Sequence, residues 1–378
     1  MKVLIVIPEF PVKMGNIKGG VNSALYNLLK GLSDKDVTIR VLSFNREIPE
    51  PILLNYSKNI AIHFIPEGKL PHFFNYCFKG SAAIKKHIRE FNPLIVHYAM
   101  SGYILLTKMF GLLNTVQMVT IHGVPFSEAR QQINIKGKLV YYTNGIVELL
   151  FKPVSTIHIS KYSSAQYRNK KKYKPTIIAN AINPDYFKIP FKNNTSNKLL
   201  YAGSIEANKN ILFILKALRL LIDKGLFFSL QVLGDFTNDG YKEDVLAFIK
   251  NNNLEEYITM YGWVSQEKLK EVMAQSDILI VSSKQETLPM VIAEAMSAGK
   301  VVVCATVGGI PEMVHHGEDG FLFNTFAVEN VLPVLEKLYN NNTLIQQIQT
   351  NARKKAIKTY HCDIVAQKTI SFYQSLLH

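Results

Sequence analysis

The segment between residues 277 and 305 constrains the fold most strongly, because it holds two short apolar runs separated by one helix. The runs are residues 277–282 (DILIVS) and 300–305 (KVVVCA), and both have the length and composition of buried strands. Pro289 suits the first turn of the intervening helix, and Gly299 suits its C-terminal cap. A strand–helix–strand unit of this kind makes the two strands parallel.

Such a unit places a ligand at the carboxyl end of its first strand, beside the N-terminus of the helix. Glu286 stands at that point, and Glu294 lies inside the helix with its carboxylate directed back toward it. The backbone N–H groups of residues 287–291 are free at the helix start and can hold an anion. The segment therefore predicts an anion-binding site with two carboxylates.

The rest of the chain repeats this alternation of strands and helices. Further strands are predicted at residues 2–8, 37–44, 60–66, 93–98, 116–121, 156–160, 176–179, 198–202, 228–233 and 257–261. A polar stretch at 180–197 reads as a linker, with the boundary near 184–191. We therefore expect an α/β protein of two doubly wound, Rossmann-like domains that face each other across a cleft. They would cover residues 1–185 and 186–362, and a C-terminal helix at about 363–378 can pack back on the first.

Each half carries a glycine loop between a strand and a helix. Gly19 and Gly20 form the first loop, and Gly203 opens the second, which reads GSIEANKN. Bare backbone beside a helix start lets a ligand come close, although a tight turn would use the same residues. Neither loop has the spacing of a dinucleotide or P-loop motif, which disfavours a nicotinamide dehydrogenase. His122 ends another predicted strand, a placement typical of an active-site residue.

The positive charge is confined to the first half of the chain. Residues 1–185 contain 24 Lys and Arg against 10 Asp and Glu, whereas residues 186–378 contain 19 of each, so the net charge of +14 lies in the first half. A nucleic acid or an anionic membrane surface would fit this asymmetry, as would a basic surface that only keeps the protein in solution. Residues 69–91 read either as a basic amphipathic helix on a membrane or as a helix that faces the core.

The sequence shows no targeting or membrane-spanning segment. The apolar run at residues 3–7 is too short for a signal peptide or a span, so we expect a cytoplasmic protein, with a peripheral membrane position open to it. Cys77, Cys304 and Cys362 are far apart and odd in number. We therefore expect reduced thiols and no metal site.

With these motifs, the chain resembles the retaining GT-B glycosyltransferases of family 4 (group 1) over nearly its whole length. The most specific match is the Glu286-x7-Glu294 pair within ETLPMVIAEAMSAG, followed by VGGIPEMV. The glycine loops, TIHG at residues 120–123, IANAINPDYF at 178–187 and GSIEANKN at 203–210 occur in the family's order.

The resemblance implies a nucleotide-sugar donor bound mainly by the second domain, with no nucleic-acid partner and no metal or other cofactor. Glu294 would accept hydrogen bonds from the ribose, Glu286 would bind the sugar, and Lys209 with the helix N-terminus would hold the diphosphate. His122 would lie beside the transferred sugar and act with Lys209 and Glu286 as a catalytic residue. The expected donor-binding residues are Gly19, Gly20, Gly203, Ser204, Lys209, Trp263, Val264, Glu286, Thr287, Leu288, Pro289, Met290, Val291 and Glu294.

Two positions depart from the family pattern. Ser204 stands where members often have Arg, so Lys209 is left as the only cation of that loop. Asn180-Ala181 stands where Asn-Gly is usual, which gives the hinge less freedom to adopt positive φ. The first change leaves one diphosphate charge less well compensated.

The sequence leaves the donor base, the sugar and the acceptor open. Family analogy points to cell-surface polysaccharide or glycolipid assembly, with a sugar or a lipid-linked acceptor. Two alternatives remain: a nucleotide-sugar 2-epimerase of the same architecture, and a non-catalytic sugar-binding protein at a membrane surface.

Overall fold

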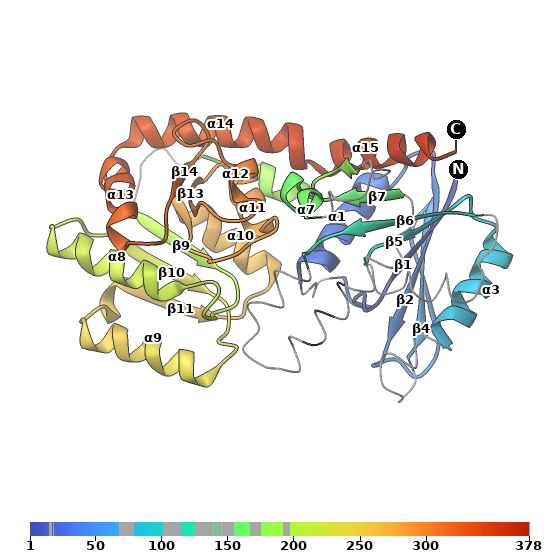
Figure 1. Cartoon of the computed structure of the whole chain (residues 1–378), viewed down its shortest axis with the longest axis horizontal. Coiled ribbons are helices and arrows are strands. Elements are labelled where there is room, and N and C mark those ends of the chain that lie inside the picture. The colour runs from blue at the N-terminus through green and yellow to red at the C-terminus, as the bar shows by residue number, and fades with distance from the viewer. Residues whose placement is uncertain are drawn as a thin grey trace. The chain divides into compact units, whose positions relative to one another are not determined.

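The computed structural model describes residues 1–14, 17, 19–67, 79–100, 115–124, 139, 142, 145, 155–166, 175–191 and 197–377. The chain folds into two compact units (Figure 1). The first contains Met1–Ala181 together with Cys362–His378, and the second contains Ile182–His361. The boundary drawn from the sequence, between residues 185 and 186, falls a few residues beyond Ala181.

The first unit is built on an eight-stranded sheet in the order β3-β4-β2-β1-β5-β6-β7-β8. Its strands are β1 (Lys2–Ile7), β2 (Thr38–Asn45), β3 (Ile52–Ser57), β4 (Ile60–Pro66), β5 (Ile95–Tyr98), β6 (Val116–Ile121), β7 (Ser155–His158) and β8 (Thr176–Ile177). All neighbours pair in parallel except β3, which runs antiparallel to β4. Strand β3 was not predicted from the sequence, because this edge strand has no buried residue and therefore no buried apolar face.

Helices of the first unit are α1 (Gly20–Leu32), α3 (Ser81–Phe91), α7 (Lys161–Ala165) and α15 (Cys362–Ser375). Helices α1 and α15 pack together, and Leu29 and Tyr373 are fully buried in the shared core. Gly31 lies at their contact, where a Cβ atom would overlap the carbonyl of Cys362. The C-terminal helix is therefore an integral part of the first unit.

Helix α3 faces the core in the described part of the basic stretch at residues 69–91. Ile84 and Ile88 are buried, whereas Lys86 and Arg89 are exposed. This burial favours the core-facing interpretation for residues 81–91 over a helix that lies apolar face down on a membrane. The aromatic residues of this stretch at positions 73–78 lie outside the described residues.

The second unit is built on a fully parallel six-stranded sheet in the order β11-β10-β9-β12-β13-β14. Its strands are β9 (Lys198–Ala202), β10 (Ser229–Leu233), β11 (Ile258–Gly262), β12 (Ile278–Val281), β13 (Val301–Ala305) and β14 (Phe321–Phe323). Its helices are α8 (Ile211–Asp223), α9 (Asp239–Asn251), α10 (Gln266–Gln275), α11 (Met290–Ser297), α12 (Ile310–Met313), α13 (Leu332–Leu338) and α14 (Asn342–Tyr360), with 3₁₀ turns η3 (Pro184–Lys188), η4 (Glu255–Tyr257) and η5 (Val328–Val331). The strand order reverses between β9 and β12, and such a switch point is where ligands bind in open α/β sheets.

The helix expected between β12 and β13 is present as α11, but it begins one residue late. Pro289 takes the N-cap position in an extended conformation instead of the first helical turn. Gly299 follows the helix with φ +63°, as expected of a C-terminal glycine. Its position is also packed, because a Cβ atom there would overlap the ring of Phe191.

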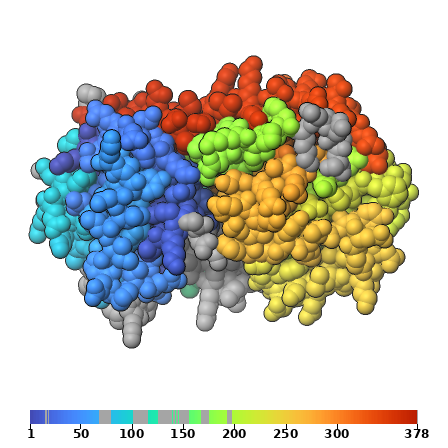
Figure 2. Space-filling model, turned by 180° about the vertical axis from the view of Figure 1, so that it is seen from behind, coloured from blue at the N-terminus to red at the C-terminus, as the bar shows by residue number. Residues whose placement is uncertain are grey.

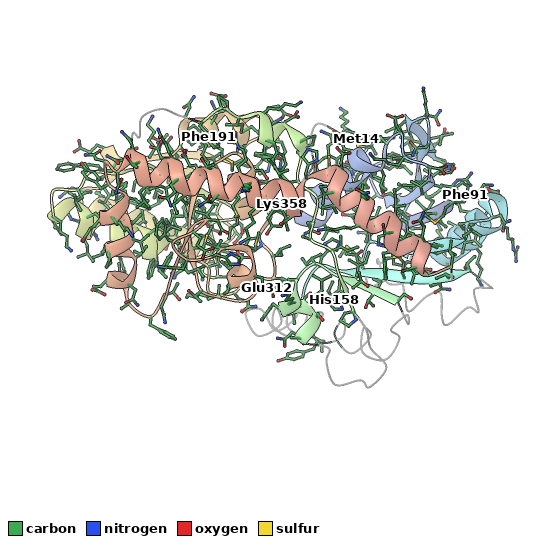
Figure 3. The ribbon with its side chains drawn as sticks, turned by 90° about the horizontal axis from the view of Figure 1, so that it is seen from above. Met14, Phe91, His158, Phe191, Glu312 and Lys358 are labelled. Atoms are coloured by element: carbon green, nitrogen blue, oxygen red, sulfur yellow. The ribbon has the colours of Figure 1, made fainter. Side chains whose placement is uncertain are left out.

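The boundary between the units lies within the expected linker, and residues 182–191 of this segment pack within the second unit. Tyr186 is fully buried and donates a hydrogen bond from its hydroxyl to Gln266 at 3.1 Å. Arg353 of α14 stacks over Phe191 with 4.0 Å to the ring centroid. Figure 3 shows Phe191 beside α14, and Figure 2 shows the segment in green against the orange and red residues of the second unit. Buried aromatic anchors hold a segment that its polar composition had marked as loose.

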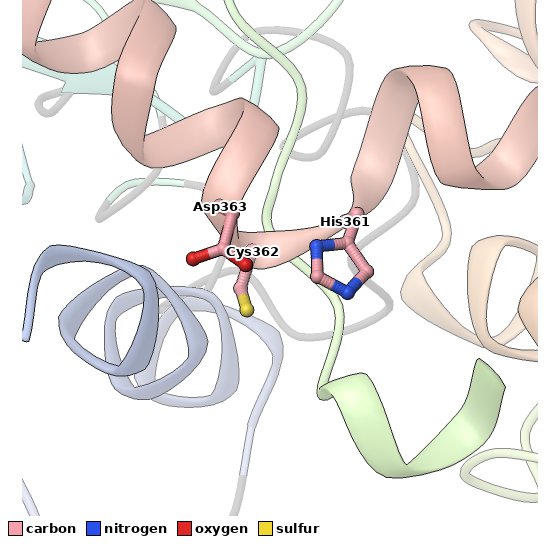
Figure 4. A group of neighbouring side chains, drawn as sticks. All are labelled: His361, Cys362 and Asp363. Carbon is pink, nitrogen blue, oxygen red and sulfur yellow. The ribbon is translucent and has the colours of Figure 1, made fainter. Parts of the chain in front are cut away.

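In the part of the chain that the structure describes, no helix combines the length and hydropathy that a membrane span requires. The described cysteines, Cys304 and Cys362, are buried free thiols, and Cys77 lies outside the described residues. His361, Cys362 and Asp363 bring a nitrogen, a sulfur and an oxygen within 4.8 Å of one another (Figure 4). These are consecutive residues, and Asp363 also lies 3.7 Å from the ammonium of Lys35. Because neighbouring residues are close by necessity, this group alone does not indicate a metal site.

Candidate functional site

Two loops meet at the switch point of the second sheet, one after β9 and one after β12. Lys284 donates its backbone N–H to the carbonyl of Asn208 at 2.8 Å, and the side chain of Asn208 donates to the carbonyl of Gln285 at 3.3 Å. The hydroxyl of Ser282 donates to the carbonyl of Lys209 at 3.0 Å. These bonds hold the GSIEANKN loop against the segment that carries Glu286.

The loops bring the side chains of Lys209 and Glu286 together. The Lys209 Nζ lies 2.6 Å from Glu286 Oε1, and the hydroxyl of Ser283 donates to the same oxygen at 2.8 Å. The Lys209 side chain is 27% exposed and the Glu286 side chain only 11%. A charge-assisted bond this short in a half-buried setting is stronger than a surface ion pair. The sequence marked both charged residues as site residues but gave Ser283 no role.

A third loop, after β13, fixes the backbone of Glu286. Gly309 donates its N–H to the Glu286 carbonyl at 3.1 Å. Gly308 has φ +54°, and a Cβ atom at this position would overlap the same carbonyl. These glycines belong to the VGGIPEMV motif, for which the sequence offered no function. Only glycine permits this approach, so the motif holds Glu286 in place.

Glu294 lies inside α11 and is 6% exposed. Burial raises the pKa of its carboxyl group to about 7, because removal from water disfavours the charged form. A carboxyl group with so little access to water and a raised pKa is typical of a functional position. Helix α11 has no side-chain cap, so the backbone N–H groups of Met290 and Val291 in its first turn have no partner within the helix.

The remaining predicted residues of the second unit also lie at the carboxyl ends of its strands. Ser204 follows Gly203 after β9, and its carbonyl accepts the hydroxyl of Tyr201 at 2.7 Å. Trp263 follows β11, is 47% exposed, and donates its backbone N–H to Asp235 at 2.9 Å. Val264, Thr287 and Leu288 are half-buried in these loops. The structure places these residues at one edge of the sheet.

The predicted residues of the first unit lie at the carboxyl ends of β1 and β6. Gly19 has φ +85° with open space where a Cβ atom would stand, and Gly20 begins α1. His122 follows β6, and its Nδ1 is buried without a hydrogen-bond partner among the described residues. Burial lowers the pKa of His122 to about 4, opposed by a hydrogen bond with the Asn180 side chain. The ring is therefore neutral near neutral pH.

A buried network that the sequence did not reveal lies beneath His122. His97 Nδ1 shares a hydrogen bond with the Tyr373 hydroxyl at 2.7 Å, and its Nε2 shares one with the Thr120 hydroxyl at 2.7 Å. A cavity of about 40 Å³ is lined by His97, Thr120, His122 and Asn180 among other residues. Through His97, the network ties the C-terminal helix to β6, the strand that precedes His122.

Solved structures with this fold cover nearly the whole chain. Sucrose-phosphate synthase from Thermosynechococcus elongatus aligns with a TM-score of 0.83 at 16% identity, over 100% of this chain and 99% of that one. HepE from Anabaena in complex with UDP-glucose aligns with a TM-score of 0.74 at 16% identity, over 99% and 100%. The fold is that of the GT-B glycosyltransferases, with two Rossmann-like domains.

Family models match both parts of the chain. The model for Glycosyltransferase Family 4 matches residues 18–186, and the model for Glycosyl transferases group 1 matches residues 183–355. A glycosyltransferase of Methanocaldococcus jannaschii, itself uncharacterized, is 24% identical over 339 residues, which is 89% of each chain. The chain belongs to the group 1 and family 4 glycosyltransferases, and it is a glycosyltransferase enzyme.

Proposed function

We propose that this enzyme transfers a sugar from a nucleoside-diphosphate sugar to an acceptor with retention of anomeric configuration and without a metal ion. The observation that carries the proposal is the cluster of Lys209, Ser283 and Glu286 at the switch point, beside the N-terminus of α11. It combines a cation, an uncapped helix end and a carboxylate within one edge of the sheet. A diphosphate linked to a sugar needs these three groups.

The diphosphate would lie at the start of α11. The N–H groups of Leu288 to Val291 and the helix dipole would stabilise the charge that develops as the glycosidic bond breaks, and Lys209 would add a full positive charge. Ser204 contributes no charge. The acceptor's proton would pass to the leaving phosphate on the same face of the sugar, which gives retention without a second carboxylate acting as base.

Glu294 and Glu286 would recognise hydroxyl groups. Glu294 would accept hydrogen bonds from the ribose, which would stabilise its charged form within a buried site. Glu286 would accept hydrogen bonds from the donor sugar. Trp263 and Val264 would contact the base, and His122, Gly19 and Gly20 would approach the sugar and phosphate from the first unit.

The neighbouring HepE structure contains UDP-glucose, so we propose a UDP-sugar as the first donor to test. A thermal-shift screen across UDP, GDP and ADP sugars identifies the base, since a bound ligand stabilises the folded protein by mass action. The anomeric configuration of the product, read by NMR, tests retention. Activity that survives chelation by EDTA tests metal independence.

The acceptor would be a sugar or lipid-linked sugar of cell-surface polysaccharide or glycolipid assembly. The first unit carries 25 Lys and Arg against 10 Asp and Glu, a net charge of +15, whereas the second carries 18 against 19, a net charge of −1. A basic unit suits a cytoplasmic enzyme that works at an anionic membrane surface. Binding to vesicles with anionic lipid should fall steeply as salt rises, and no binding at low salt would reject the membrane partner.

The 2-epimerase and the non-catalytic sugar-binding protein of the sequence analysis are tested by the same assay. Conversion of the nucleotide sugar to an epimer without acceptor would indicate the epimerase. Release of nucleotide only when donor and acceptor are both present would indicate transfer and reject the non-catalytic alternative.

A further inference from the structure

The cation and the carboxylate that the proposed donor needs are bonded to each other in the structure. Lys209 Nζ lies 2.6 Å from Glu286 Oε1, yet under the proposed function Lys209 holds the diphosphate and Glu286 holds the sugar. A diphosphate that takes Lys209 as its counter-charge must therefore draw it away from Glu286. Breaking the ion pair has one free-energy cost when a complete donor binds and another when the nucleoside diphosphate that remains after transfer binds.

We infer that Glu286 determines specificity for the complete nucleotide sugar over the product nucleoside diphosphate, by competing with the diphosphate for Lys209. This inference rests on the proposed function of the same site. When the complete donor binds, the sugar hydroxyls replace Lys209 as partners of the Glu286 carboxylate. When a nucleoside diphosphate binds, no sugar is present, and a carboxylate with little access to water loses its cation without replacement. Removing one partner of such a pair costs more than the pair itself contributes.

The surroundings of Glu286 make it costly for its carboxylate to lose Lys209 as a partner. Its backbone is held by the Gly309 N–H, and Gly308 lies against its carbonyl. Its side chain is 11% exposed, so water cannot fully solvate the carboxylate after Lys209 leaves. Ser283 still donates to Oε1 and keeps the side chain in place. Oε1 receives both bonds and Oε2 has no hydrogen bond among the described residues, which leaves Oε2 for a sugar hydroxyl.

The lysine is free to change partners. Its ammonium group ends a flexible four-carbon stem, and its side chain is 27% exposed. Its backbone is fixed, because its carbonyl accepts the hydroxyl of Ser282 at 3.0 Å. The competition is acute here because Lys209 is the only Lys or Arg of the GSIEANKN loop, and Ser204 contributes no charge. One lysine therefore serves either Glu286 or the diphosphate.

The test measures the affinity of UDP alone by isothermal titration. In Glu286→Gln, Lys209 is no longer paired with a carboxylate, so UDP should bind about three- to tenfold more tightly than it binds the wild-type enzyme, although sugar transfer falls. Glu206→Gln is the matched control, because it removes the same charge from the loop of Lys209 without touching the ion pair. It should change UDP affinity by less than about twofold. In a Lys209→Met background the gain from Glu286→Gln should disappear.

An unchanged or weaker UDP affinity in folded Glu286→Gln would overturn the inference, as would an equal gain in Glu206→Gln. If Glu286→Gln does not fold, Glu286→Ala serves instead, because it also removes the carboxylate that pairs with Lys209. A wild-type enzyme that binds none of the UDP, GDP or ADP sugars would reject the proposed function itself. If the wild-type enzyme binds a nucleotide sugar but Glu286→Gln does not bind UDP more tightly, only the role of Glu286 in specificity is rejected.

Discussion

Glu294→Gln should stabilise the second unit at the expense of donor binding. Burial raises the pKa of Glu294 from 4.5 to about 7, and a shift of one unit corresponds to about 1.4 kcal/mol. The ionised side chain therefore costs the folded protein about 3 kcal/mol above pH 7. Glutamine has nearly the same shape and no charge, so it should recover most of this free energy.

The sign of the pH dependence follows from the raised pKa. Below the pKa of the unfolded chain, both states carry the proton and Glu294 has no cost. As the pH rises toward 7, the unfolded chain releases the proton while the folded chain keeps it, so stability falls. The gain from Glu294→Gln should therefore be near zero at about pH 4.5 and close to full at about pH 8.

Chemical denaturation of both proteins at the two pH values measures this difference, with unfolding of the second unit followed by Trp263, the only tryptophan in the chain. A gain of about 3 kcal/mol corresponds to a melting temperature roughly 6–12 °C higher for a unit of this size. Glu243→Gln, at an exposed position of α9, is the matched control and should change little. A gain that is equal at both pH values, or a loss of stability at about pH 8, would contradict a burial cost of the charged Glu294 side chain.

Three further predictions use other residues. Lys209→Ala should slow transfer more than it weakens donor binding, because its charge matters most as the bond breaks, and steady-state kinetics separates the two effects. Gly308→Ala should reduce transfer, whereas Gly317→Ala, which also has positive φ but open space, should cost stability alone. Burial lowers the pKa of His97 to about 3 and that of His122 to about 4. Below about pH 6.5 the unfolded chain takes up a proton at each histidine while the folded chain does not, so each should lower the stability of the first unit by up to about 1.4 kcal/mol per pH unit. Acid denaturation measures this loss.

The alternation of apolar runs and helices predicted the fold class and most strands. Runs such as residues 300–305 are buried on both faces of a parallel sheet, and this environment makes them readable from composition alone. Strand β3 escaped because it lies at an edge and buries no residue. The polar composition of residues 182–191 gave no sign that Tyr186 is buried.

The sequence marked Lys209 and Glu286 as separate site residues, but their ion pair could not be predicted from it. The two residues lie in loops that follow β9 and β12, and only the pairing of these strands brings the loops together. Ser283 and Gly308 were missed for the same reason, since their roles are contacts with Glu286 that span loops. The available signal was the glycine pair before Ile310. It indicates that another part of the backbone comes close to this loop, but it does not identify that part as Glu286.

The buried charged residues of the second unit divide by the edge of the sheet at which they lie. At the amino end of β12, Asp277 is 1% exposed and accepts the backbone N–H of Lys198 at 3.0 Å. At the amino end of β13, the buried ammonium of Lys300 donates to the carbonyl of Ala274 at 3.0 Å. These bonds join neighbouring elements and stabilise the fold.

The carboxyl edge uses its buried charges in another way. Burial raises the pKa of Glu294 there, and the Glu286 carboxylate is paired with the cation that a ligand would take from it. Burial of the Glu294 carboxylate costs stability until a ligand supplies a partner for its charge, whereas the Glu286 pair becomes costly only when a ligand takes Lys209 from it. A unit selected for stability alone would bond its buried charges to backbone groups of neighbouring elements, as Asp277 and Lys300 are bonded at the amino edge. The stability cost of Glu294 therefore lies at the edge where strand order reverses, and under the proposed function the hydroxyl groups of the donor would lower it.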